Sequence, residues 1–224
     1  MWQSLVQSTR GSTQENDFTV IAVALDRPEA ARPWIEAAAP TYPCLIDRDH
    51  RVAELYHLVN VPQAVWIDEA GRIVRPAEPA GAYEGFRQMN RTTREMPEEV
   101  ARRTAQAKTL YLDAIRDWAR NGGRSAYAFT PEQARAHLPA VTEDAATAQA
   151  LFRLAQVLIR RGEREEADRW IREASRLHPD SWCIWRQGAG VTDLGLAAQP
   201  DFWERVDGLG AKRYYAPVDM PGMP

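Results

Sequence analysis

The spacing of hydrophobic residues changes along the chain and divides it into two parts. Residues 18–25, FTVIAVAL, are almost all apolar at consecutive positions, a pattern typical of a parallel strand that helices cover on both faces. Residues 28–39 carry apolar side chains at helical spacing, and prolines end that helix before a short strand at 44–46. The first part is therefore predicted to contain a strand, a helix and a second strand.

A further helix and a hairpin are predicted after the second strand. The helix is expected between about residues 49 and 60, with Asp49 as its N-cap. Val61 and Pro62 then precede the apolar run 64–67, a polar turn and a second apolar run, which together indicate two strands joined by a tight turn. Proline has no N–H for a sheet ladder and forms the one bond in which cis is cheap. We therefore predict a cis Val61–Pro62 bond at the start of a β-hairpin.

Helical periodicity dominates the rest of the chain. Pro79 and Gly81 mark a boundary, after which apolar residues repeat at intervals of three and four from Pro97 to about residue 121. A short helix is expected at 131–138. We therefore predict two domains, residues 1–80 and residues 81–224.

The clearest helical motif lies at about 145–180. Small and large apolar residues alternate there as in a tetratricopeptide (TPR) repeat, and a proline ends the second helix. The residues of this pattern are Leu151, Leu154, Ala155, Leu158, Gly162, Ala167, Ile171, Ala174 and Pro179. One repeat cannot bury both of its faces, so we expect the long helix from Pro97 to be a degenerate neighbour in a small helical array. The second domain is therefore predicted to be all-α and TPR-like.

Two blocks of the first part, FTVIAVALD and YPCLIDRDHRVAELYHLVNVPQAVWIDEAGRIVRP, resemble the TlpA/ResA-like branch of the thioredoxin superfamily. The resemblance covers about the first third of the chain. It implies a lineage of thiol–disulfide oxidoreductases, a thioredoxin-like fold, and a protein partner or a protein thiol or disulfide as substrate. It also implies that Val61 and Pro62 form a substrate-facing loop, which lies opposite a redox-active CxxC pair. No cofactor is expected.

The sequence departs from this family at the redox centre. Family members carry the CxxC pair at the start of the first long helix, where the helix dipole stabilises a thiolate. Residues 1–9 have the spacing of the tail of such a helix, and the chain contains no CxxC. The predicted fold is therefore a thioredoxin-like α/β domain that lacks its first strand and the start of its redox helix. Either the chain is a fragment of a longer redox protein, or it is a relative that has lost its redox centre.

The chain has two cysteines, Cys44 and Cys183, which do not make a disulfide framework. Cys44 opens a predicted core strand, so an inert buried thiol is favoured over a catalytic role. Cys183 lies in an aromatic run and is expected to pack in the core. No residue is therefore assigned as catalytic. A catalytic role for Cys44 is the less favoured alternative.

Histidine spacing gives little support for a metal site. His50 and His57 are seven residues apart, and Asp47 and Asp49 lie beside the first. A turn and a helix cap explain this segment more economically, because no third ligand has useful spacing. We expect no metal.

Charge and hydropathy exclude two classes of partner. Twenty-eight basic and 31 acidic side chains give a net charge of −3, which provides no general field that attracts nucleic acid. No apolar run approaches the roughly 18 residues needed to span a bilayer. The chain as given is expected to be cytoplasmic, although a segment upstream of Met1 could carry an export signal.

Two functions therefore follow from the sequence. The first is the thiol–disulfide oxidoreductase lineage, with no redox catalysis by the chain as given because the CxxC pair is absent. The second is a non-catalytic scaffold that binds partner proteins through its thioredoxin-like and TPR-like surfaces. Whether the chain is an enzyme stays open at this point.

Overall fold

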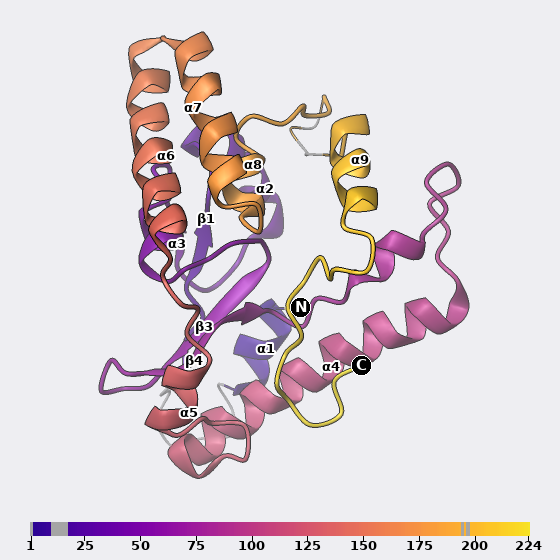
Figure 1. Ribbon diagram of the computed structural model, residues 1–224. Helices are drawn as coiled ribbons and strands as arrows, with labels where there is room; N and C mark the ends of the chain where they lie inside the picture. The colour runs from indigo at the N-terminus through magenta and orange to yellow at the C-terminus, as the bar shows by residue number, and fades with distance from the viewer. Residues whose placement is uncertain (1, 10–17, 194, 196–197) are drawn as a thin grey trace.

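A computed structural model describes residues 2–9, 18–193, 195 and 198–224 (Figure 1). Its first part consists of short helices and strands, as the hydrophobic pattern predicts. Their order is α1 (Trp2–Thr9), β1 (Ala22–Ala24), α2 (Pro28–Ala38), β2 (Cys44–Ile46), α3 (Arg51–Leu55), β3 (Gln63–Ile67) and β4 (Ile73–Pro79).

The four strands form two separate ladders within the described residues. β1 and β2 are parallel, with Ala22 opposite Cys44. β3 and β4 form the predicted antiparallel hairpin, with Gln63 opposite Pro79 and two irregularities in the register. The expectation that 18–25 is an interior strand is wrong for the described structure. β1 is three residues long and pairs with β2 alone, and the Ile21 side chain beside it is 57% exposed.

The second part is helical after a 3-10 helix, η1 (Glu84–Gln88). Its elements are α4 (Glu98–Asn121), the 3-10 helix η2 (Gly122–Arg124), α5 (Pro131–Ala136), α6 (Glu143–Arg161), α7 (Arg164–Leu177), α8 (Trp182–Trp185) and α9 (Pro200–Gly208). No helix of the described residues is long and apolar enough to cross a membrane.

The segment with the TPR-like pattern forms a helical hairpin. Thr142 caps α6 by accepting a hydrogen bond from the Ala145 amide, and Gly162 ends it at φ 82°. α7 then runs back along α6 (Figure 1). Ala155 and Ala174 are fully buried between the two helices, and such small residues allow close approach of the helix axes.

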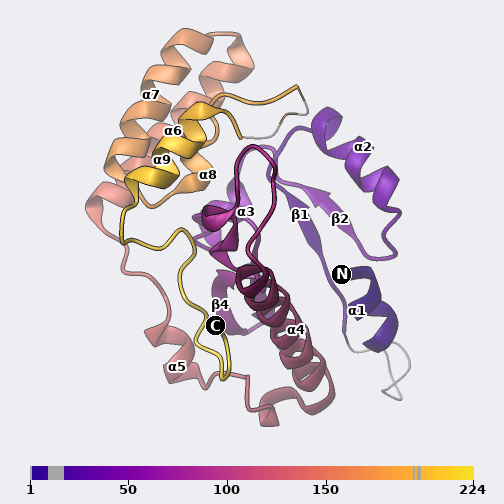
Figure 2. The same cartoon turned by 90° about the vertical axis from the view of Figure 1, so that its right-hand side faces the viewer.

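The long helix α4 does not extend this hairpin. Its buried stripe, which includes Tyr111 and Ile115, packs in one core with Leu5 of α1 and Trp66 of β3. Figure 2 shows α4 beside α1 and away from α6 and α7. The expectation that α4 is a neighbouring repeat is therefore wrong, because its apolar face is used by the thioredoxin-like part. The apolar core therefore contains residues from both sides of residue 80, the predicted domain boundary.

α3 begins at a cap that differs from the predicted one. The Asp47 carboxylate accepts hydrogen bonds from the amides of Arg51 and Val52, both at 2.7 Å. His50 has a left-handed backbone, φ 53°, and this turn brings Asp47 to the start of the helix. Asp49 is instead exposed and forms an ion pair with Arg160 of α6.

One face of α6 lies against this turn and joins the two parts of the chain. Arg153 of α6 forms an ion pair with Glu54 of α3. Between the two ion pairs, His50 is buried, and its ring lies edge-on to Phe152, 5.2 Å between centroids. The Gln156 side-chain amide donates to His50 Nδ1 at 3.2 Å. This contact suits a neutral imidazole, because a protonated Nδ1 could not accept the bond.

The buried His50 predicts a loss of stability in mild acid. Burial lowers the pKa of His50 below its usual value of 6.5, although Asp47 partly opposes the shift. As the pH falls through 6.5, the unfolded chain takes up a proton that the folded chain excludes, so the free energy of unfolding decreases. Urea unfolding between about pH 8 and pH 5 should show this decrease. His50→Gln should make it smaller, and an identical pH dependence in that variant would contradict the prediction.

Candidate functional site

The predicted substrate-facing loop lies between α3 and β3. The Val61–Pro62 peptide bond is cis, the isomer that the sequence predicts. Asn60, only 3% exposed, organises the backbone before it. Its side-chain oxygen accepts from the Val61 amide at 2.9 Å and from Arg186 at 3.0 Å. The loop is therefore held by contacts with residues far along the chain.

Two distant segments cover this loop. The Cys183 amide of α8 donates to the carbonyl oxygen of Val59 at 3.0 Å. The Asn60 side-chain amide donates to the carbonyl oxygen of Tyr214 at 3.2 Å. The Tyr215 hydroxyl donates to the carbonyl oxygen of Val61 at 3.3 Å. The loop that the sequence assigns to a partner is thus already in contact with the chain's own C-terminal part.

The two cysteines are not joined in a disulfide. Cys44 is half-buried in β2, and its thiol donates to the carbonyl oxygen of Tyr42 at 3.7 Å. It is less buried than the sequence predicts, since β2 has a described neighbour on one edge only. Cys183 is buried, and burial raises the pKa of its thiol to about 11. At neutral pH Cys183 is therefore a thiol and a poor nucleophile.

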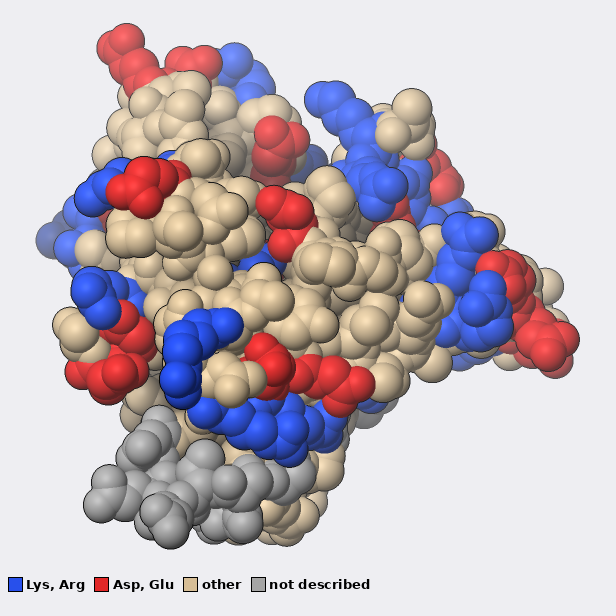
Figure 3. Space-filling view, turned by 90° about the horizontal axis from the view of Figure 1, so that it is seen from below, with Lys and Arg blue, Asp and Glu red and all other residues tan. Residues whose placement is uncertain are grey.

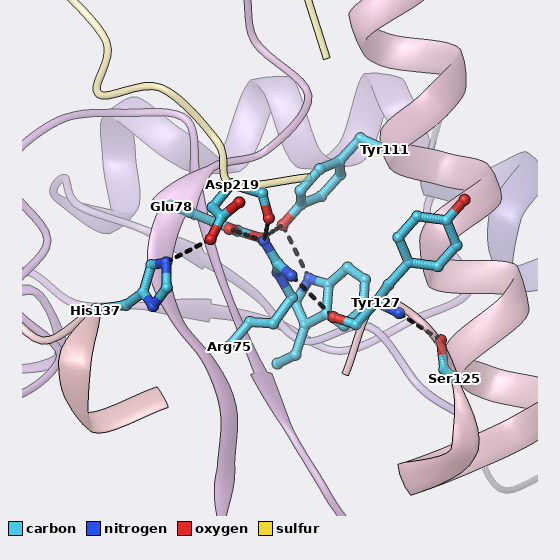
Figure 4. Close-up of polar contacts among 8 residues, drawn as sticks. Arg75, Glu78, Tyr111, Ser125, Tyr127, His137 and Asp219 are labelled. Atoms are coloured by element: carbon cyan, nitrogen blue, oxygen red, sulfur yellow. Dashed lines mark hydrogen bonds and ion pairs between the residues drawn. The ribbon is translucent and has the colours of Figure 1, made fainter. Parts of the chain in front are cut away.

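A second polar cluster lies beneath the hairpin, around Arg75 of β4 (Figure 4). The Arg75 side chain is 1% exposed and forms a bidentate ion pair with Glu78, both bonds at 2.8 Å. Its two terminal nitrogens also donate to the carbonyl oxygens of Tyr127 and Asp219, both at 2.8 Å. The buried guanidinium is thereby paired with a carboxylate and hydrogen-bonded through all three nitrogens, which offsets the cost of burying its charge.

The cluster continues into the aromatic core. The Tyr111 hydroxyl donates to Glu78 at 3.1 Å and accepts from the Trp66 indole N–H at 2.9 Å. Burial raises the pKa of Tyr111 well above its usual value of 10.0, so Tyr111 stays a neutral donor. The Arg75 guanidinium also lies over the Phe129 ring, 4.0 Å from its centroid. The polar groups of this cluster are hydrogen-bonded to one another, which is typical of a structural role. We call the cluster around Arg75 and Glu78 the Arg75 brace.

His137, at the end of α5, connects the Arg75 brace to the C-terminal segment. Its ring stacks on Phe129 at 4.2 Å, and its Nε2 lies 3.0 Å from an Asp219 carboxylate oxygen. β4 carries both Arg75 and Glu78 among apolar residues, and this charged pair is the one local sign of the cluster in the sequence. Periodicity identifies Arg75 as a strand residue but cannot identify its partners at positions 127 and 219.

The structure places His50, one of the two histidines considered above, in the contact between α6 and the turn before α3. His50 contacts Gln156, as described above, and no group of three or more His, Cys, Asp or Glu in the described part of the chain is placed to hold a metal ion. On the face shown in Figure 3, basic and acidic side chains lie side by side.

Residues 4–75 match the family model of the AhpC/TSA family. The matched region runs from α1 to β4 and includes the Val61–Pro62 loop. No curated protein and no solved structure matches the chain. The first third of the chain is thus thioredoxin-like and similar to the redoxins, a group of thiol oxidoreductases and peroxiredoxins.

The buried position of Arg75 predicts a large effect of removing its charge. Arg75→Met leaves the Glu78 carboxylate buried without its partner, so the free energy of unfolding should fall by about 3–5 kcal/mol. The matched control is Arg102→Met, since Arg102 forms an exposed ion pair with Glu99, and its loss should cost at most about 1 kcal/mol. Urea unfolding of both variants measures the difference, and equal losses would contradict the structural role of Arg75.

Proposed function

We propose that this chain is a thioredoxin-like module of the TlpA/ResA lineage of thiol–disulfide oxidoreductases, and that it does not itself catalyse thiol–disulfide exchange. The observation that carries the second half is the placement of the thiols. Exchange requires a thiolate that attacks and a second thiol nearby that releases the product. Cys183 is buried, and its thiol has a raised pKa. The Cys44 thiol donates a hydrogen bond to the carbonyl oxygen of Tyr42, which lies just before β2.

Two observations support the lineage. The match to the AhpC/TSA family covers residues 4–75. Within it, the Val61–Pro62 loop leads directly into the β3–β4 hairpin, in the order in which the TlpA/ResA-like proteins arrange these elements. In such proteins the loop faces the redox pair, so we assign Val61 and Pro62 to the surface that meets a protein thiol or disulfide.

The alternative is a non-catalytic module that binds another protein. The observation that favours it is the use of the loop backbone in the folded chain. The carbonyl groups of Val59 and Val61 accept hydrogen bonds from residues of another segment, Cys183 and Tyr215. A surface that binds one polypeptide segment in this way is suited to binding another, with no thiol chemistry involved.

The proposal predicts that the purified 224-residue chain does not accelerate the reduction of insulin by dithiothreitol. The turbidity of precipitating insulin B chain should rise at the rate of dithiothreitol alone, and a thioredoxin assayed in parallel serves as positive control. Cys44→Ser should behave like the unmodified chain. If the chain is active and Cys44→Ser abolishes the activity, then Cys44 is a nucleophile and the proposal is wrong.

An extended variant separates the two candidates. A strand followed by a CxxC helix start, added upstream of Trp2, should confer turnover if the module retains the redox scaffold of the lineage. If the extended chain folds but stays inactive, the binding module is the better assignment.

A further inference from the structure

The C-terminal segment crosses the molecule between two points of attachment. After α9 the chain runs back past the sheet to α4, and it contains no helix or strand from residue 209 to residue 219 (Figures 1 and 2). Near its start, Arg87 of η1 donates to the carbonyl oxygens of Gly210 and Lys212, both at 2.9 Å. At its far end, the carbonyl oxygen of Asp219 is bound by Arg75, and Met220 is buried in the core.

Between these points the segment inserts one aromatic ring. Tyr214 is buried against Trp182 and Phe86, at centroid distances of 4.5 and 4.8 Å. Its amide donates to Glu84 at 2.8 Å, and its hydroxyl is bound by Arg186. Tyr214 therefore fixes the place at which the segment passes over the loop.

Tyr214 and the next residue, Tyr215, make the contacts with the loop. Asn60 binds the Tyr214 carbonyl, and Tyr215 donates its hydroxyl to the Val61 carbonyl. The Val61 side chain remains 40% exposed, so the loop lies near the surface beneath this segment. The Val61 carbonyl is a backbone acceptor, and the N–H of an extended polypeptide could take the place of the tyrosine hydroxyl.

We propose that residues 209–216 form a movable cover over residues 59–61, which opens to admit an extended segment of a partner protein. This inference rests on the assignment of the loop as a partner-facing surface. The cover is held by the Arg87 and Asn60 bonds to its carbonyls, by the contacts of Tyr214 with Glu84 and Arg186, and by the rings of Tyr214 and Tyr215. Segments without a helical or strand ladder open at lower free energy than the core does. The bond between Arg75 and Asp219 retains the far end when the cover opens.

Cys183 provides a reporter of this opening. Its amide is bonded to Val59 of the loop, and its thiol is buried. In a Cys44→Ser background it is the single thiol. Its rate of reaction with an aromatic disulfide reagent, together with hydrogen exchange of the Tyr214 amide, which is bonded to Glu84, therefore follows the cover.

The test variant is Arg87→Gln, which removes the charged donor to Gly210 and Lys212. The variant removes two charged hydrogen bonds to the segment and the ion pair with Glu84. Loss of one charged hydrogen bond already corresponds to roughly a tenfold change in an opening equilibrium, so thiol labelling and exchange of the Tyr214 amide should become at least about tenfold faster. Exchange of the α6–α7 amides should not change. Arg176→Gln is the matched control, because Arg176 forms an exposed pair with Glu173 on α7, and it should leave Cys183 labelling unchanged.

Tyr215→Phe is the second variant, since it removes only the hydroxyl that contacts Val61 and keeps the ring. It should accelerate labelling in the same direction with a smaller effect. Unchanged labelling in both variants overturns the cover. So does an acceleration that appears equally in α6 and α7, because opening is then global unfolding. Insulin reduction by the chain would refute the proposed function without altering these rates, so the two failures are distinguishable.

Discussion

The buried guanidinium of Arg75 is the constraint on which the arrangement of the chain depends. A charge at this depth is tolerated only when it is paired and hydrogen-bonded, and Arg75 takes its acceptors from Glu78, Tyr127 and Asp219. These belong to β4, to the segment after α4 and to the C-terminal segment. The hairpin, the long helix and the chain end are thereby brought to one point. Tyr111 and Trp66 continue this chain of hydrogen bonds from Glu78 into the apolar core.

From this point the second half of the chain folds back on the first. The C-terminal segment passes over the Val59–Val61 loop before its Asp219 carbonyl reaches Arg75. α6 meets the α3 turn through ion pairs on either side of the buried His50. The Val59–Val61 loop is therefore flanked by α8 and by the C-terminal segment. Access to the loop depends on how these elements are attached, so the packing of the helical part bears on the partner-facing role proposed for the loop.

Local patterns predict the elements that depend on neighbouring residues. The proline-led hairpin, the helix over Pro28–Ala38 and the α6–α7 pair all follow from periods of two or 3.6 and from turn residues. The region of the AhpC/TSA match also coincides with the blocks that carry the family resemblance. Each of these elements depends on a pattern that is local in the sequence.

Contacts between distant segments leave no such pattern. The Asn60–Tyr214 bond joins residues 154 positions apart, and nothing in the spacing of either residue predicts it. The apolar stripe of α4 fits a repeat neighbour as well as it fits Trp66, so periodicity alone selected the wrong partner. At α3 the cap came from Asp47 and not Asp49, because the left-handed turn at His50 decides which carboxylate reaches the amides.

The central claim is that the chain holds Cys183 as a buried, unreactive thiol while the Val59–Val61 loop is bound by the chain's own C-terminal part. The most direct measurement is the thiolate absorbance of folded Cys44→Ser as a function of pH, which reports the ionisation of Cys183 alone. The structure predicts that Cys183 ionises near pH 11, where burial places its pKa. A thiolate that forms near neutral pH in the folded protein would contradict the account, because Cys183 would then be an activated nucleophile beside the loop.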